Sequence, residues 1–217
     1  MKIAIHQANY FPYPGFFHKI NQADVFVIQD DVKFVNRTTN RNKIISSSEY
    51  TWINVPITKG HKSLPIMDVK INNEIPWGKI NLKKICAGYN KAKFFHLYKD
   101  YFENLYKKEW NNIFDLNFET IKQVLRWLDI KVEIVIESEL RVSGQPTERL
   151  VKVCKKLGAD TYISGIGGKR YLDEKLFEKN KIIIEYQNYN PIRYFQHMSE
   201  SFIPNLSIID LLANMGS

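Results

Sequence analysis

Residues 1–31 read MKIAIHQANYFPYPGFFHKINQADVFVIQDD and contain two short apolar runs on either side of a segment with helical spacing. The runs 3–5 and 25–28 are short enough for buried strands. Between them, the apolar residues of 16–20 (FFHKI) lie at i, i+1 and i+4, which suits one face of a helix. These residues therefore predict a strand, a helix and a second strand, the repeating unit of a parallel α/β sheet.

Each predicted strand ends in residues that can take part in chemistry. His6 and Gln7 end the first strand, and Asp30 and Asp31 follow the second. Ligands of a parallel α/β sheet bind outside the carboxyl ends of its strands, so we expect these residues at one edge. His6 is the candidate catalytic acid or base, with a structural histidine as the alternative. The two aspartates are candidate catalytic residues that would orient sugar hydroxyls or hold a cation, or else only cap a turn. No third carboxylate or histidine has matching spacing, so no dedicated metal site is expected.

The rest of the chain alternates between the two kinds of element. Predicted helices lie within 77–110, 118–128, 146–157 and 171–179, and predicted strands at 51–57, 66–71, 132–136, 161–163 and 182–184. This alternation predicts an α/β fold whose largely parallel sheet carries helices on both faces, with 51–57 and 66–71 as an antiparallel edge extension. No repeat or linker divides residues 1–217, so a single domain is expected.

Composition narrows the class of protein and of partner. The 217 residues include 31 Lys and Arg against 23 Asp and Glu, a formal net charge of +8. This balance favours an anionic partner, although the lysines are dispersed as on an ordinary solvated surface. No apolar run approaches the roughly 18 residues of a membrane span and Met1 leads directly into a strand, so we expect a cytoplasmic protein without such a span. Cys86 and Cys154 lack metal-binding spacing and are expected to pack as small apolar side chains.

Two early segments carry side chains suited to a polar ligand. The aromatic turn 9–15 (NYFPYPG) offers a ring for stacking on a base or a sugar. The segment 36–43 (NRTTNRNK) combines arginines, whose planar guanidinium matches phosphate, with amides that can bind hydroxyls or base edges. A disordered cationic loop is the alternative for the second segment. Together with Gln7 at the end of the first strand, the candidate substrate-binding residues here are Asn9, Tyr10, Arg37, Asn40, Arg41 and Asn42.

Two later segments add further candidates. The predicted strand 161–163 leads into SGIGGK, in which glycines let the backbone approach a ligand and free N–H groups suit a phosphate or carboxylate. The spacing matches neither the P-loop nor the dinucleotide motif, so a tight turn is the alternative. In the apolar helix predicted near the end of the chain, two polar residues lie one turn apart and either line a site or only favour the helix dipole. The candidate substrate-binding residues are Ser164, Gly165, Gly168, Lys169, Asp210 and Asn214.

Taken in order, several blocks of the chain resemble the WbqC-like family. They are HQANYFPYPGFFHKI at 6–20, ADVFV at 23–27, NRNKI at 40–44, WINVPI at 52–57, and the segments 165–171 and 202–216. Ala8 stands where that pattern has a proline and Pro14 where it has leucine or a similar residue, which changes the stiffness of the turn. The resemblance implies a role in the biosynthesis of O-antigen or another bacterial surface polysaccharide, through modification of a nucleotide-linked amino sugar.

The residues and the resemblance together lead to a hypothesis for the reaction. We expect a transferase that acylates or aminoacylates the amine of a nucleotide-linked amino sugar, with His6 taking the amine proton. Arg37, Arg41 and Lys169 would hold the diphosphate. The acyl donor would be carried by an acidic carrier protein or a tRNA, and no coenzyme signature indicates a cofactor.

Two other classes of protein stay open. One is a nucleotidylyl or adenylate-forming transferase that uses ATP and magnesium. Its HIGH-type members are similar in having a strand that ends in His before a Pro/Gly turn, but Phe16 or Phe17 stands at the place of their second histidine. The other is a non-catalytic protein that binds nucleic acid or serves polysaccharide assembly, whose affinity would fall steeply with salt.

Overall fold

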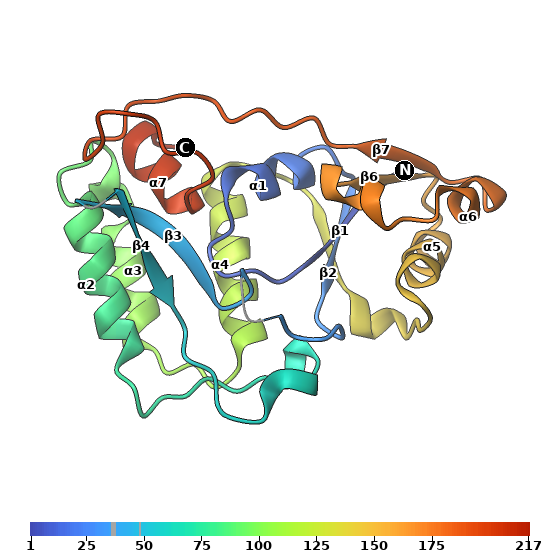
Figure 1. Ribbon diagram of the computed structural model, residues 1–217, viewed down its shortest axis with the longest axis horizontal. Coiled ribbons are helices and arrows are strands. Elements are labelled where there is room, and N and C mark those ends of the chain that lie inside the picture. Colours follow the sequence, from blue (N-terminus) through green and yellow to red (C-terminus); the bar gives the residue numbers. More distant parts are fainter. Residues whose placement is uncertain (36–37, 48) are drawn as a thin grey trace. The chain divides into compact units, whose positions relative to one another are not determined.

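The computed structural model describes residues 1–35, 38–47 and 49–217, which form two compact units (Figure 1). The sheet unit consists of 1–7, 15–32 and 130–190, and the hairpin unit consists of 8–14, 33–129 and 191–217. Arg37, a candidate ligand for phosphate, lies outside the described residues. The assignment of residues 1–217 to a single domain stays a prediction.

A five-stranded parallel sheet forms the centre of the sheet unit. Its strands are β1 (Lys2–Gln7), β2 (Val25–Gln29), β5 (Glu133–Ile136), β6 (Thr161–Ser164) and β7 (Ile183–Tyr186), in the order β5-β2-β1-β6-β7. All neighbouring strands are parallel, which confirms the predicted α/β class. The chain builds one side of the sheet from β1 outward and then the other, as in doubly wound α/β folds.

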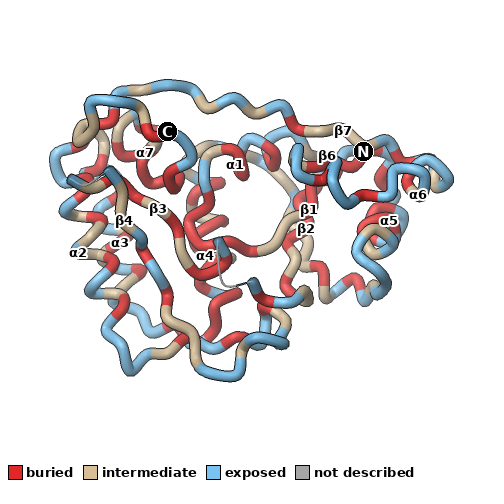
Figure 2. The backbone as a smooth tube through the Cα atoms, viewed as in Figure 1, coloured by how far each residue is buried: buried red, intermediate tan, exposed pale blue. Residues whose placement is uncertain are grey.

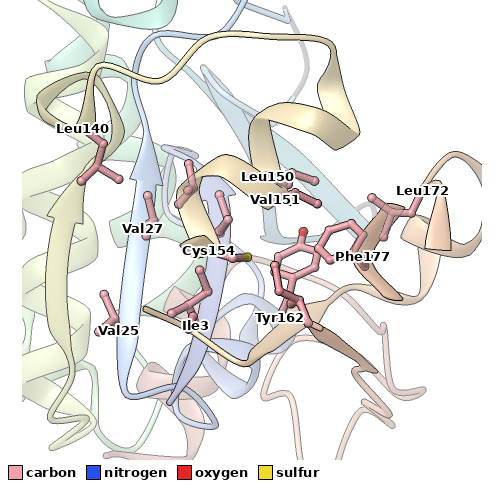
Figure 3. Packing of buried hydrophobic residues seen from close by; sticks show 14 residues of the cluster. Ile3, Val25, Val27, Leu140, Leu150, Val151, Cys154, Tyr162, Leu172 and Phe177 are labelled. Atoms are coloured by element: carbon pink, nitrogen blue, oxygen red, sulfur yellow. The ribbon is translucent and has the colours of Figure 1, made fainter. Parts of the chain in front are cut away.

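Alternation along β1 and β2 sends side chains to helices on both faces of the sheet. Odd-numbered residues such as Ile3 and Val27 pack in a buried cluster with α5 (Pro146–Leu157) and α6 (Glu174–Lys179), shown in Figure 3. Cys154 of α5 is fully buried in this cluster, as expected for a small apolar side chain. On the other face, Phe26 meets Phe16 of α1 (Pro14–Ile20), with 5.7 Å between ring centroids. Short 3-10 helices η4 (Glu137–Leu140) and η5 (Ile166–Arg170) follow β5 and β6.

The hairpin unit contains a separate antiparallel pair, β3 (Arg41–Ser46) and β4 (Glu49–Asn54). Its helices are α2 (Trp77–Tyr89), α3 (Lys99–Lys107), α4 (Ile113–Trp127) and α7 (Ile208–Met215), with 3-10 helices η1 (His61–Ser63), η2 (Ile66–Asp68) and η3 (Phe95–Leu97). Buried residues run along α4 and β3 (Figure 2). Aromatic residues of the segment 94–105 supply much of this core, because Phe95, Tyr98 and Phe102 are almost fully buried.

One prediction about local structure was wrong in this unit. The segment 66–71 alternates apolar and polar residues as a strand does, but its first three residues form η2. Its only β-pairing among the described residues consists of two isolated bridges, to Ile57 and to Asn112. The described end of the segment 36–43 does not form the disordered cationic loop that was the alternative for it, because residues 41–43 begin β3. Its buried Ile44 and Ile45 hold the strand in the core, which outweighs the polar character of the residues before them.

Candidate functional site

The carboxyl ends of the parallel strands form one polar edge of the sheet unit. His6 is paired in register with Ile28, and Gln7 with Gln29 at the end of β2, so the predicted shared edge is present. The chain places β2 and β5 on one side of β1, then β6 and β7 on the other. The order reverses between β1 and β6, and sheets of this kind bind ligands outside the strand ends at such a switch point. His6 lies at the end of β1 and Ser164 at the end of β6, the two strands that flank the switch point.

His6 is a neutral histidine at this edge. Its ring is half-buried and lies edge-on to the ring of Phe16, with 4.9 Å between the two ring centroids. Its Nδ1 lies 3.1 Å from the carbonyl oxygen of Gln7. A carbonyl oxygen can only accept, so Nδ1 carries the hydrogen and Nε2 presents a lone pair. Loss of water around the ring, and then the charge of Lys19, lower the pKa of His6 to about 3, against the smaller opposing effect of the Gln7 carbonyl. The imidazole is therefore ready to accept a hydrogen bond at neutral pH.

Lys19 is a second titratable group at the same edge, and the sequence analysis did not single it out. It is only 3% exposed, and its ammonium donates to the carbonyl oxygen of Ile5 at 3.1 Å. Burial lowers the pKa of Lys19 to about 7, near the value suited to an acid or base in a neutral cell. A lysine on the apolar face of a helix, three residues after Phe16, is the signal that could have identified it.

Asp30 and Asp31 both interact with the segment that follows β5. Asp30 is 3% exposed and accepts hydrogen bonds from the Ser138 N–H at 3.0 Å and the Ser138 hydroxyl at 2.6 Å. Asp31 pairs at 3.4 Å with Arg149, which also pairs with the buried Glu137. β2 ends at Gln29, so the two carboxylates lie past the strand. Both carboxylate oxygens of Asp30 are thus hydrogen-bonded to the segment after β5. A catalytic role for either aspartate stays a prediction.

The glycine-rich segment after β6 folds as η5. The Ser164 hydroxyl donates to the Gly165 carbonyl at 3.1 Å, and the Gly168 N–H donates to the same carbonyl at 2.9 Å. A Cβ at Gly168 would lie 2.2 Å from the Ser164 hydroxyl oxygen, whereas one at Gly165 would meet nothing within 4 Å. Gly168 is thus required for packing, and the exposed Lys169 extends its ammonium over the Tyr186 ring at 4.9 Å.

A group of buried amides lies in the hairpin unit. Asn117 of α4 donates to the carbonyl oxygens of Ala8 at 2.9 Å and Thr39 at 2.7 Å, which joins the aromatic turn to the segment before β3. Asn40 donates to the Val55 carbonyl at 3.0 Å. The side-chain oxygens of Asn9, Asn40 and Asn117 are buried and find no donor in the described part of the chain, and neither does the Thr39 hydroxyl. Such acceptors suit a ligand or water that brings hydroxyl or amine hydrogens.

Other predicted binding residues of this unit already have protein partners. Tyr10 is fully buried, with its hydroxyl bonded to Tyr106 and to Asn81, so its ring offers no face for stacking on a ligand. Asn42 donates to the Phe11 carbonyl at 2.6 Å and supports the aromatic turn. Arg41 remains available, with its guanidinium over the Trp52 ring at 4.7 Å.

Asp210 and Asn214 lie on one face of α7, as predicted. The Asp210 carboxylate is fully buried and accepts from the Tyr194 hydroxyl at 2.8 Å and the Gln196 amide at 2.7 Å. Burial raises the pKa of Asp210, and these donors oppose that rise. Asn214 donates to the Asp210 carbonyl and accepts from the His197 N–H. This network holds the segment 194–203 to α7, while a binding role for the pair stays a prediction.

Comparison with known proteins decides the family. The WbqC-like protein family matches residues 7–217, nearly the whole chain. The chain belongs to this family. One similar protein is the uncharacterized protein Rv1507c of Mycobacterium tuberculosis. The two sequences are 31% identical over 219 residues, which cover 100% of this chain and 94% of the relative. No solved structure matches the chain.

Family membership confirms the resemblance drawn from the sequence and suggests a role in surface-polysaccharide biosynthesis. Among the described residues, no group of three or more His, Cys, Asp or Glu side chains is placed to hold a metal ion. Within that same part of the chain, none of the helices has both the length and the apolar character needed to cross a bilayer.

Proposed function

We propose that this protein is a transferase that acylates or aminoacylates the amine of a nucleotide-linked amino sugar. The observation that carries the proposal is the pair formed by His6 and Lys19 at the switch point of the parallel sheet. An amine nucleophile must lose a proton as it attacks, and this edge supplies two nitrogen bases. Family membership supports the setting in surface-polysaccharide biosynthesis.

In the proposed reaction, the amine nitrogen of the sugar forms a bond to the acyl carbon. The bond from that carbon to the oxygen or sulfur of the donor breaks, and the amine proton ends on the leaving group or in water. His6 accepts a hydrogen bond from the amine through Nε2 and so orients the nitrogen lone pair. With a pKa of about 3 His6 retains a proton poorly, whereas the pKa of Lys19, about 7, suits it to hold the proton for longer.

Lys169 fits recognition of the phosphates of the substrate. It carries an exposed positive charge beside the strand ends of the sheet unit. The donor would be an acyl or aminoacyl group on an acidic carrier protein or a tRNA, in keeping with the net charge of +8.

Thermal stability against a panel of ligands tests the substrate class. The panel holds a UDP- or dTDP-linked amino sugar, the same nucleotide linked to the corresponding hydroxyl sugar, the bare nucleotide, ATP with magnesium, and a tRNA mixture. A ligand at about a hundred times its Kd adds about 2.7 kcal/mol, which raises Tm by roughly 5 to 10 °C at this chain length. The amino sugar should give the largest shift. Equal shifts with the amino and hydroxyl sugars would contradict the proposal, and a shift with ATP and magnesium alone would favour a nucleotidylyl transferase.

A further inference from the structure

One face of the β3–β4 hairpin carries two aromatic rings and two cations side by side. Lys43 is opposite Trp52 in the antiparallel register, with Arg41 two residues before it and Tyr50 two residues before Trp52, so all four side chains share a face. The Arg41 guanidinium lies 4.7 Å from the centre of the Trp52 ring. The Lys43 ammonium lies 4.0 Å from the centre of the Tyr50 ring and 5.5 Å from that of Trp52. We call these four residues the aromatic-cationic face.

The hairpin holds this face rigidly. Ile44 and Ile53, on the opposite side of the two strands, are fully buried in the core of the hairpin unit. Lys84 of α2 donates to the main-chain carbonyl oxygen of Trp52 at 2.7 Å, which fixes β4 and adds a third positive charge nearby. Trp52 is nevertheless 37% exposed, whereas Trp77 and Trp110 are 6% exposed. An exposed tryptophan on a rigid strand keeps its ring in place at little entropic cost.

No counter-ion for the cations of this face is found among the residues that the structure describes. Among the described residues, neither Arg41 nor Lys43 forms an ion pair, although other basic side chains such as Lys2 and Arg149 do. The Arg41 Nε is also buried without a hydrogen-bond partner in that part of the chain. A ligand that brings negative charge would supply the missing partner. Flat rings beside the cations favour a ligand that also has a flat, polarisable group, and a nucleoside phosphate combines both.

We infer that the aromatic-cationic face binds a nucleoside diphosphate group, with the base stacked on Trp52 and Tyr50 and the phosphates on Arg41 and Lys43. This inference goes beyond the proposed function and concerns the hairpin unit alone. A neutral sugar could use the rings without needing the cations. An acidic peptide could use the cations without needing the rings.

Titration calorimetry with UDP, dTDP and GDP tests the inference. Trp52→Ala should weaken binding of the diphosphate that the wild-type protein prefers by about 5- to 100-fold, the range of base–aromatic stacking. Trp52→Phe should retain most of the affinity because a ring remains. Phe195→Ala is the matched control, since Phe195 is a 77% exposed aromatic residue elsewhere in the hairpin unit. Circular dichroism verifies that each variant is folded.

Two further measurements separate the two halves of the ligand. Lys43→Gln should weaken binding of the diphosphate and leave binding of the uncharged nucleoside unchanged. Stacking on Trp52 should alter the intrinsic tryptophan fluorescence on addition of nucleotide, and this change should vanish in Trp52→Phe while calorimetric binding persists.

The inference is overturned if none of the three diphosphates binds the wild-type protein, or if Trp52→Ala and Lys43→Gln bind them as the wild type does. It is also overturned if a single-stranded oligonucleotide binds this face far more tightly than any nucleotide, because the face would then serve nucleic acid. Binding that depends on Trp52 without any modification of an amino sugar would support the inference and count against the proposed function.

Discussion

The side-chain ammonium of Lys19 donates a hydrogen bond to the main-chain carbonyl oxygen of Ile5 at 3.1 Å, next to His6 at the end of β1. A single carbonyl gives a buried ammonium little compensation for the water it has lost, and its pKa falls to about 7 as a result. The same positive charge depresses the pKa of His6. Burial thus keeps Lys19 partly neutral near pH 7, and its charged form helps to keep His6 neutral at the edge where chemistry is proposed.

Lys19 makes the stability of the fold depend on pH. Its pKa is about 7 in the folded state and about 10.4 in an unfolded chain. Between these values the unfolded chain binds more protons, so the free energy of unfolding should rise with pH, by at most ~1.4 kcal/mol per pH unit. Chemical denaturation at pH 7, 8.5 and 10 should show this rise in the wild type and lose it in Lys19→Met. The exposed Lys175→Met is the control and should keep the rise; an equal rise in Lys19→Met would refute the assignment.

Gly168 and Gly167 should differ sharply in their tolerance of a side chain. A Cβ at Gly168 would overlap the Ser164 hydroxyl oxygen, so Gly168→Ala should lower the free energy of unfolding by about 1–3 kcal/mol. A Cβ at Gly167 would meet nothing within 4 Å, so Gly167→Ala should change stability by less than about 0.5 kcal/mol. Urea denaturation of the two variants measures both values. Similar losses at the two positions would show that η5 is packed differently.

The two adjacent aspartates should contribute unequally to stability. Asp30→Ala removes a buried acceptor from both the N–H and the hydroxyl of Ser138, which should cost about 1–3 kcal/mol. Asp31→Ala breaks a pair whose carboxylate is 45% exposed, and the cost should stay below about 1 kcal/mol. Denaturation curves recorded side by side give the difference. If Asp31→Ala proved the more costly change, the turn after β5 would depend on Arg149 instead of Ser138.

Gln196 joins the segment before α7 to the helix itself. Its side chain exchanges hydrogen bonds with the main chain of Ile203 and donates to the buried Asp210 carboxylate. Gln196→Ala leaves these groups unpaired, so we expect a loss of about 1–3 kcal/mol and faster proteolysis within residues 191–206. Gln22→Ala, at an exposed glutamine, should change neither quantity. Unchanged proteolysis in Gln196→Ala would mean that other contacts hold the segment.

Much of the sheet unit could be predicted from sequence because its signals are local. Short apolar runs, helical spacing and the polar residues at strand ends are enough to place β1, α1 and β2, and to bring His6 and the aspartates to one edge. Which groups those aspartates bind could not be predicted, because Ser138 and Arg149 are more than a hundred residues away in the chain. The unusual state of Lys19 also depends on burial, which a single sequence indicates only by the position of the lysine on an apolar face.

The hairpin unit was predicted less well because its elements depend on distant contacts. β3 has a polar start and is a strand because it pairs with β4 and buries Ile44 and Ile45. Tyr10 resembles a ligand-stacking residue in sequence, but it is buried and its hydroxyl is hydrogen-bonded to that of Tyr106, which lies 96 residues away in the chain. Asn117 joins the two segments chosen as binding candidates, yet in sequence it is only one asparagine within a helix. Long-range pairing and burial of this kind leave no short motif.

The most direct measurement is the mass of the sugar product made by the wild type and by His6→Ala. The nucleotide-linked amino sugar is incubated with acetyl-CoA, with a charged acyl carrier protein or with an aminoacylated tRNA mixture. The wild type should add one acyl or aminoacyl group to the amino sugar and none to its hydroxyl counterpart. His6→Ala should lower kcat because the amine is no longer oriented for attack, with a nearly unchanged Kd for the nucleotide sugar. Absence of product with every donor would contradict the transferase account, and equal losses in kcat and binding would contradict the role of His6.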